Sequence, residues 1–101
     1  MFIKAAKLKE LPDGAIIEKT VEGRPLVLVN QGGKIYCLDA ICSHEEVSLA
    51  GGFCENNCLV CPAHGAMFDL DTGAVKLGPA VAPIKTYQIK IKDEDILVSL
   101  S

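Results

Sequence analysis

Two cysteine–histidine pairs constrain this chain more than any other feature. The first is Cys42-Ser43-His44 and the second is Cys61-Pro62-Ala63-His64, with sixteen residues between them. Together they contain both histidines of the chain. A thiolate and an imidazole two or three residues apart can point at one metal ion or cluster. The pattern therefore predicts a fold that brings two short loops together at a metal site.

Length and charge narrow the kind of protein that carries this site. The chain has 101 residues, half of them hydrophobic and 23% charged, with a formal net charge of -3. These values indicate one soluble globular domain over residues 1–101. A mildly acidic chain without a lysine and arginine cluster is not expected to bind nucleic acid or an anionic membrane surface.

The N-terminal residues and the cysteine count favour a cytoplasmic protein. Lysines interrupt every possible apolar core of a signal peptide within the first ten residues. In a reducing compartment, five cysteines are metal ligands or buried thiols more often than a disulfide framework. Cys37 lies in an alternating strand pattern, which predicts a buried thiol. Cys54 and Cys58 flank a turn and could face each other, but free thiols are favoured there.

Short apolar runs between turn residues predict an all-β fold. Residues 26–29 and 35–38 are separated by Asn30-Gln31-Gly32-Gly33, which is typical of a hairpin. The β-branched stretch 15–20 is expected to pair with the first of these strands. An alternating pattern over residues 84–92 predicts one strand, and 96–100 predicts the last. With no pattern of helical period, the chain is expected to form a sandwich or barrel.

The middle of the chain differs in composition from both ends. Between about residues 39 and 83 it is richer in Gly, Pro, Cys and His. We interpret this segment as a part of the chain that leaves the main strands and is stabilised by something other than apolar packing.

The ligand types allow two kinds of metal. Two thiolates and two imidazoles suit tetrahedral zinc, and they also suit a 2Fe-2S cluster with both cysteines on one iron and both histidines on the other. The spacing favours iron and sulfur, because structural zinc sites usually begin with a C-x-x-C knuckle. A zinc site built from Cys54, Cys58, Cys61 and His64 remains an alternative.

On these motifs the chain resembles the Rieske-type ferredoxins, in their low-potential form. The resemblance is carried by residues 42–52, 61–73 and 78–80 and extends over nearly the whole chain. It implies an all-β Rieske fold, with an antiparallel strand base and a smaller cluster-binding subdomain at about 39–83. It also implies one 2Fe-2S cluster per chain. The ligands would be Cys42 and Cys61 on the inner iron and His44 and His64 on the outer iron.

The same resemblance implies an electron carrier and not an enzyme. The chain is similar to the ferredoxin components of ring-hydroxylating dioxygenase systems. Electrons would come from a flavoprotein or ferredoxin reductase and pass to a terminal oxygenase. Two alternatives remain: a zinc-stabilised interaction module, and the small subunit of an assimilatory nitrite reductase, which commonly lacks this ligand set. The chain shows no Ser/His/Asp arrangement or phosphate-binding loop for catalysis.

Four positions imply a low reduction potential. High-potential relatives have an additional cysteine in each ligand loop, a serine after the second loop and a tyrosine beyond it. Here those positions hold Val47, Ala63, Ala66 and Phe68. Because hydroxyl donors stabilise the added negative charge, their loss predicts a midpoint near the low end of the Rieske window, roughly -150 mV.

Overall fold

The computed structural model describes residues 1–42, 47–63, 65–78 and 82–100. Within these ranges the structure consists of strands, two short 3-10 turns and loops, with no α-helix. The predicted all-β fold class is confirmed. No helix among the described residues is long and apolar enough to cross a membrane.

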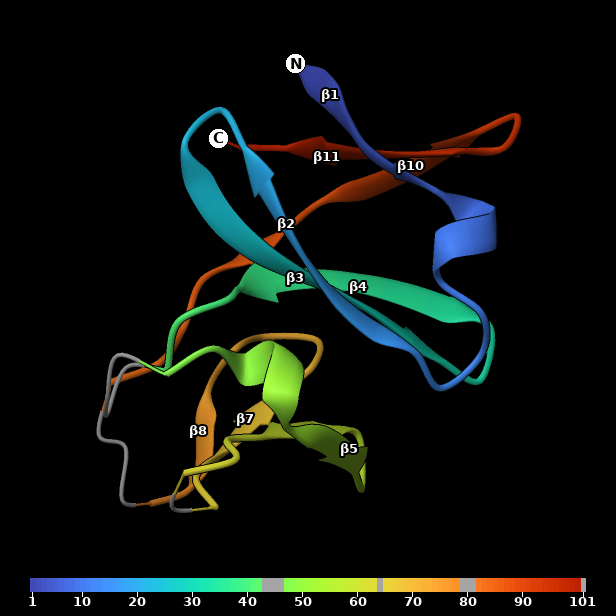
Figure 1. The fold of residues 1–101 in the computed structure, drawn as a ribbon. Coiled ribbons are helices and arrows are strands. Elements are labelled where there is room, and N and C mark those ends of the chain that lie inside the picture. Colours follow the sequence, from blue (N-terminus) through green and yellow to red (C-terminus); the bar gives the residue numbers. More distant parts are fainter. Residues whose placement is uncertain (43–46, 64, 79–81, 101) are drawn as a thin grey trace.

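The strands form three antiparallel sheets. Figure 1 shows two of them at one end of the molecule and the third at the other. We call β1-β11-β10 and β2-β3-β4-β9 the base sheets, and β5-β6-β7-β8 the site sheet. The base strands are β1 (Phe2–Lys7), β2 (Ile16–Val21), β3 (Arg24–Gln31), β4 (Lys34–Asp39), β9 (Thr86–Tyr87), β10 (Ile89–Lys92) and β11 (Asp95–Ser99). The site strands are β5 (Phe53–Glu55), β6 (Cys58–Val60), β7 (Met67–Asp69) and β8 (Val75–Leu77), and the 3-10 turns are η1 (Leu8–Glu10) and η2 (Leu49–Gly51).

Strand β3 supplies side chains to both apolar cores of the protein. Leu26 and Leu28 pack into the core between the base sheets, whereas Val27 and Val29 pack into a second core shared with the site sheet. All four side chains are fully buried. Because successive strand residues point to opposite faces, a continuous apolar run is what a strand buried on both faces requires. The run at 26–29 therefore explains how one strand holds both ends of the molecule together.

The predicted hairpin and its neighbouring strand are confirmed. β3 pairs with β4 from Leu26↔Asp39 to Gln31↔Lys34, and Gly32 and Gly33 form the two-residue connection. Both of these glycines have positive φ, as the tight turns of two-residue hairpins require. The stretch expected to pair with β3 does so as β2, from Ile16↔Val29 to Val21↔Arg24.

The single strand predicted over residues 84–92 is wrong. The chain instead forms two strands in different sheets, with Gln88 between them. β9 pairs with β4 through Cys37↔Tyr87, and β10 pairs with β11 through Ile89↔Val98. Local alternation is the same on both sides of Gln88, so it carries no information about a change of partner. The sequence also gave no indication of β1, which covers the far edge of β11.

The site sheet lies within the segment 39–83. Its four strands have three residues each, so few ladder hydrogen bonds hold it. Gly73 connects it to the returning chain, because the Ile84 N–H donates to the Gly73 carbonyl at 3.0 Å. A Cβ on Gly73 would lie 1.9 Å from the Ile84 carbonyl oxygen, and its φ is +77°. Only glycine fits this contact.

Candidate metal centre

Cys42 stands at the start of a closed loop. Its backbone N–H donates to the Val47 carbonyl at 3.0 Å, and Ile41 forms an isolated bridge with Ser48. The Cys42 side chain is 4% exposed. The predicted ligand His44 falls inside this loop, outside the described residues.

Cys61 stands at the start of a second loop with the same closure. Its N–H donates to the Ala66 carbonyl at 2.8 Å, and the Gly65 N–H donates back to the Cys61 carbonyl at 3.1 Å. The side chain is 2% exposed. The predicted ligand His64 falls outside the described residues. In both loops, therefore, a buried cysteine donates its N–H to the carbonyl five residues later.

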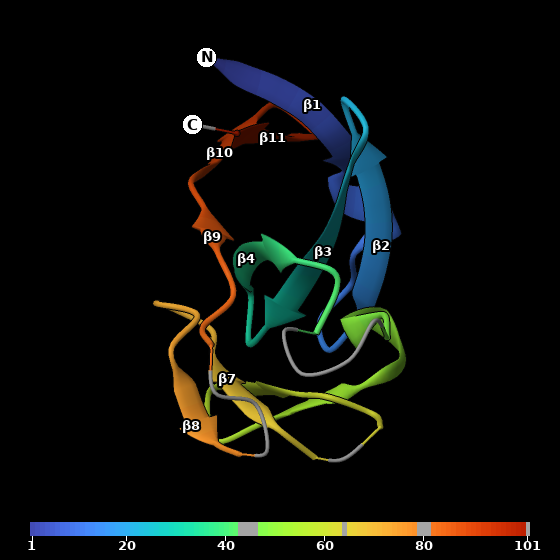
Figure 2. The same ribbon diagram turned by 90° about the vertical axis from the view of Figure 1, so that its left-hand side faces the viewer.

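The fold brings these two loops together. Cys42 and Cys61 belong to one buried cluster, which also includes Val27 and Val29 of β3. Figure 2 shows the segments on either side of both loops at the end of the molecule away from the termini. Within the described ranges, no group of three or more Cys, His, Asp or Glu side chains is arranged to hold a metal ion. The described part of the predicted ligand set is thus two buried thiols, converging from two loops of the same design.

The segment after the first loop fixes its position with side-chain contacts that sequence reasoning missed. The Ser48 hydroxyl accepts from the Ala50 N–H at 3.2 Å and so caps η2. The same hydroxyl donates to a Glu18 carboxylate oxygen on β2. Gly52 follows, and a Cβ there would lie 1.9 Å from the Val60 carbonyl oxygen of β6. A serine before a short turn is a recognisable cap signal, but its link to Glu18 is not visible in the sequence.

Cys54 and Cys58 are not joined by a disulfide. In the β5–β6 register, Cys54 lies opposite Leu59 and Cys58 lies opposite Glu55. Opposite residues share a face and adjacent ones do not, so the two thiols point to opposite faces of the hairpin. This register also separates two of the ligands that the alternative zinc site would need.

Cys37 is a buried thiol, as predicted. It is 2% exposed and belongs to the core between the base sheets. Burial, with a smaller contribution from the Asp39 carboxylate, raises the pKa of the Cys37 thiol to about 12. It therefore stays protonated at neutral pH and is not poised to bind a metal.

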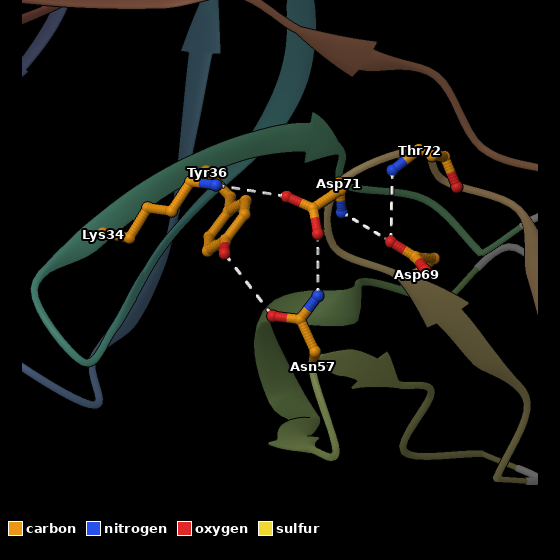
Figure 3. Close-up of polar contacts among 6 residues, drawn as sticks. All are labelled: Lys34, Tyr36, Asn57, Asp69, Asp71 and Thr72. Carbon is orange, nitrogen blue, oxygen red and sulfur yellow. Dashed lines mark hydrogen bonds and ion pairs between the residues drawn. The ribbon is translucent and has the colours of Figure 1, made fainter.

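A polar bridge ties the site sheet to the base. Figure 3 shows the Tyr36 hydroxyl donating to the Asn57 side-chain oxygen at 3.4 Å and the Asn57 amide donating to Asp71 at 2.9 Å. Lys34 of β4 reaches the same carboxylate at 3.3 Å. The Asn57 hydrogen bond, with that of Lys34, lowers the pKa of the Asp71 carboxyl below its ordinary value. Asp69 turns the chain by accepting from the Asp71 N–H at 2.7 Å.

Two positions linked to the reduction potential are apolar and fully enclosed. Ala66 and Phe68 are both 0% exposed and lie in the same cluster as Cys42 and Cys61. Neither side chain has a hydroxyl. In the third segment that carries the resemblance, residues 78–80, Gly78 is described, whereas Pro79 and Ala80 lie outside the described residues.

The comparisons with known proteins agree with this arrangement. The chain matches the family described as the Rieske [2Fe-2S] domain over residues 1–88. The chain belongs to the Rieske family. It is 37% identical over 100 residues to the ferredoxin component of the naphthalene 1,2-dioxygenase system of Pseudomonas aeruginosa, covering 99% of this chain and 96% of the relative. It is 38% identical over 96 residues to the 3-phenylpropionate/cinnamic acid dioxygenase ferredoxin subunit of Photorhabdus laumondii, covering 93% and 90%.

A solved structure agrees with the sequence relatives. The ferredoxin of carbazole 1,9a-dioxygenase from Nocardioides aromaticivorans superimposes with a TM-score of 0.92 at 30% identity, covering 98% of this chain and 97% of that one. The predicted Rieske fold and the relation to dioxygenase ferredoxins are confirmed. This Rieske protein is an electron carrier with one 2Fe-2S cluster per chain, and two buried thiols fit that group. Neither the zinc-stabilised module nor the nitrite reductase subunit is favoured.

Proposed function

We propose that this Rieske protein carries single electrons from a reductase to the terminal oxygenase of an aromatic-ring dioxygenase system. The observation that carries the proposal is the pair of matched loops with buried cysteines, in a chain that aligns along nearly its whole length with dioxygenase ferredoxins. The proposal includes a flavoprotein or ferredoxin reductase as donor. It also includes a cytoplasmic location, in keeping with Cys54 and Cys58 as thiols.

The proposal assigns the cluster ligands to Cys42, His44, Cys61 and His64. Cys42 and Cys61 are supported by their burial in one apolar cluster and by the matching closure of their loops. The two histidines are supported by their spacing from these cysteines. We also propose residues 39–83 as the cluster-binding subdomain of a single domain.

The ligand set has an electrostatic consequence. The bound cluster would supply reversible one-electron chemistry. Two thiolates and two neutral imidazoles bring an oxidised 2Fe-2S site to a formal charge of about zero, against about -2 for four thiolates, which makes an added electron easier to accept. The Cys42 and Cys61 side chains are buried, so the sulfur atoms of these two proposed ligands are shielded from water.

Electron transfer with defined components tests the function. The probes are the reductase and terminal oxygenase of the naphthalene 1,2-dioxygenase system of Pseudomonas aeruginosa. With NADH and this protein added, we expect the oxygenase to be reduced and naphthalene to be oxidised, and we expect neither without the protein. A protein that is reduced but never passes electrons to the oxygenase would contradict the proposed acceptor.

Substitution of single cysteines tests the ligand assignment. Anaerobically purified protein is expected to contain two iron and two acid-labile sulfide per chain, and Cys42→Ser and Cys61→Ser are each expected to lose them. Cys54→Ser is the matched control, because it makes the same chemical change at a cysteine that is not a proposed ligand. Cys54 also lies on the opposite face of the hairpin from Cys58. Loss of iron from Cys54→Ser, with retention in Cys42→Ser, would show that the ligands are assigned wrongly.

A further inference from the structure

A groove lies where the chain leaves the base and where it returns. The segment after β4 and the segment before β9 run side by side in Figure 1. The Asp39 N–H donates to the Lys85 carbonyl at 2.9 Å, and the Lys85 N–H donates to the Asp39 carboxylate at 3.2 Å. The groove at this junction has a volume of about 430 Å³. We call it the neck groove; its lining residues are Arg24, Pro25, Asp39, Ile41, Lys85 and Tyr87.

Two cations of the neck groove have no carboxylate partner among the residues that the structure describes. The Arg24 guanidinium lies 5.8 Å and the Lys85 ammonium 5.1 Å from the centre of the Tyr87 ring. The Arg24 guanidinium donates two long hydrogen bonds, to the Tyr87 hydroxyl at 3.3 Å and to the Leu100 carbonyl at 3.5 Å. Neither cation forms an ion pair with any carboxylate in the described ranges.

The one carboxylate among the described lining residues, that of Asp39, already accepts hydrogen bonds from neutral donors. One Asp39 oxygen accepts from the Tyr87 hydroxyl at 2.6 Å, and the other accepts from the Lys85 backbone N–H. The lining therefore has two cations against one occupied carboxylate. This is a positive feature beside an acidic region, since residues 40–83 contain five carboxylates and one lysine.

The groove also adjoins the first ligand loop. Ile41 forms one wall, is 38% exposed, and directly precedes the buried Cys42. A small inorganic anion would leave the Ile41 surface in water, whereas a side chain with methylene groups would cover it while its carboxylate met the cations.

We propose that the neck groove docks an acidic side chain, Asp or Glu, of the protein that accepts the electron. This rests on the proposed function and adds the chemistry and place of one contact. An acidic side chain held between Arg24 and Lys85 fixes the partner's position within a few residues of Cys42. A positive groove next to an acidic loop region specifies one orientation of the partner, because the reversed orientation places like charges together.

Charge reversal in the groove tests the proposal. Reduced protein is mixed with the oxidised terminal oxygenase of the Pseudomonas aeruginosa naphthalene 1,2-dioxygenase system, and the second-order rate constant is measured at several ionic strengths. The Arg24→Glu/Lys85→Glu variant is expected to react about tenfold more slowly at low salt and to depend less on salt. Its iron content and midpoint potential are expected to be unchanged.

A matched control separates the groove from net charge. The Lys90→Glu/Lys92→Glu variant makes the same change of charge on β10, in a base sheet. Its second-order rate constant is expected to stay within twofold of that of the unmodified protein. Arg24→Lys keeps the charge and is also expected to stay within twofold. If the double variant Arg24→Glu/Lys85→Glu loses iron, the single variants Arg24→Gln and Lys85→Gln test the docking proposal instead. Each is expected to lower the second-order rate constant about threefold.

Failure of the docking proposal can be distinguished from failure of the proposed function. A groove variant within twofold of the unmodified protein, or an equal loss in the Lys90/Lys92 control, would overturn the docking proposal and leave the electron-carrier function intact. An unmodified protein that passes no electrons to the oxygenase would overturn the proposed acceptor, and the docking proposal with it.

Discussion

The base sheets and the site sheet are stabilised in different ways. The base strands run to eight residues and enclose an apolar core of their own. Each site strand has three residues, and the side chains buried beneath them belong to a core completed by Val27 and Val29 of β3. Loop closures at Cys42 and Cys61 and the bridge through Asn57 and Asp71 supply the remaining contacts. The comparison shows that the site sheet depends on the base, whereas the base core is complete by itself.

The sharpest test of this difference truncates one leucine in each core. Leu28 of β3 and Leu59 of β6 are both 0% exposed, one in the base core and one in the shared core. Replacing either by alanine is expected to cost about 2–5 kcal/mol of unfolding free energy. Only Leu59→Ala is expected to speed iron release below the unfolding transition, because it loosens the site sheet locally. Denaturant titration measures the unfolding free energy, and the rate of iron release is followed in the same samples. Equal rates of iron release from the two variants would contradict the proposed difference between the base sheets and the site sheet.

Gly73 tests the connection between the two regions. Gly73→Ala is expected to destabilise the protein by about 3 kcal/mol, because alanine meets both an unfavourable positive φ and the Ile84 carbonyl. Gly14→Ala is the matched control: its φ is +85° with nothing within 4 Å, so only the backbone cost of about 1–2 kcal/mol applies. Thermal unfolding of the two variants compares them. Similar losses of stability in the two variants would show that the contact between residues 73 and 84 accommodates the added methyl group without destabilising the protein.

Alkaline pH tests the base core through Cys37. The folded pKa of this thiol is about 12, against an ordinary value of 9.0. Its stabilising effect is complete below pH 9. Above pH 9 the unfolded chain ionises while the folded chain does not, so the unfolding free energy is expected to fall by about 1.4 kcal/mol per pH unit, up to about pH 12. Cys37→Ala should lack this part of the slope, and identical pH profiles for the two proteins would refute the assignment.

The smallest expected effect concerns the electronics of the site. Ala66→Ser and Phe68→Tyr add hydroxyls at two enclosed positions. A new donor near the added negative charge is expected to raise the midpoint potential by some tens of millivolts, since 59 mV corresponds to about 1.4 kcal/mol for one electron. Protein-film voltammetry measures the shift. A starting midpoint above about +150 mV would show that other features set the potential, given the window of -150 to +300 mV.

Local sequence was sufficient where neighbouring residues decide the structure. The Cys42 and Cys61 motifs predicted two loops that meet, and the structure places both cysteines in one buried cluster, whereas the four-residue ligand set stays a prediction. The β3–β4 hairpin followed from its turn residues, and the burial of Cys37 followed from strand alternation. In these cases the deciding interactions lie within a few residues of each other along the chain.

Tertiary structure decided the features that depend on which strands meet. The split of residues 84–92 at Gln88 reflects two different partner strands, and a two-residue period cannot name a partner. The opposite faces of Cys54 and Cys58 follow from the β5–β6 register, which the turn sequence alone left open. The neck groove depends on Asp39 and Lys85, which are 46 residues apart and meet only because β9 returns beside β4. Such contacts form through long-range packing, so no local pattern encodes them.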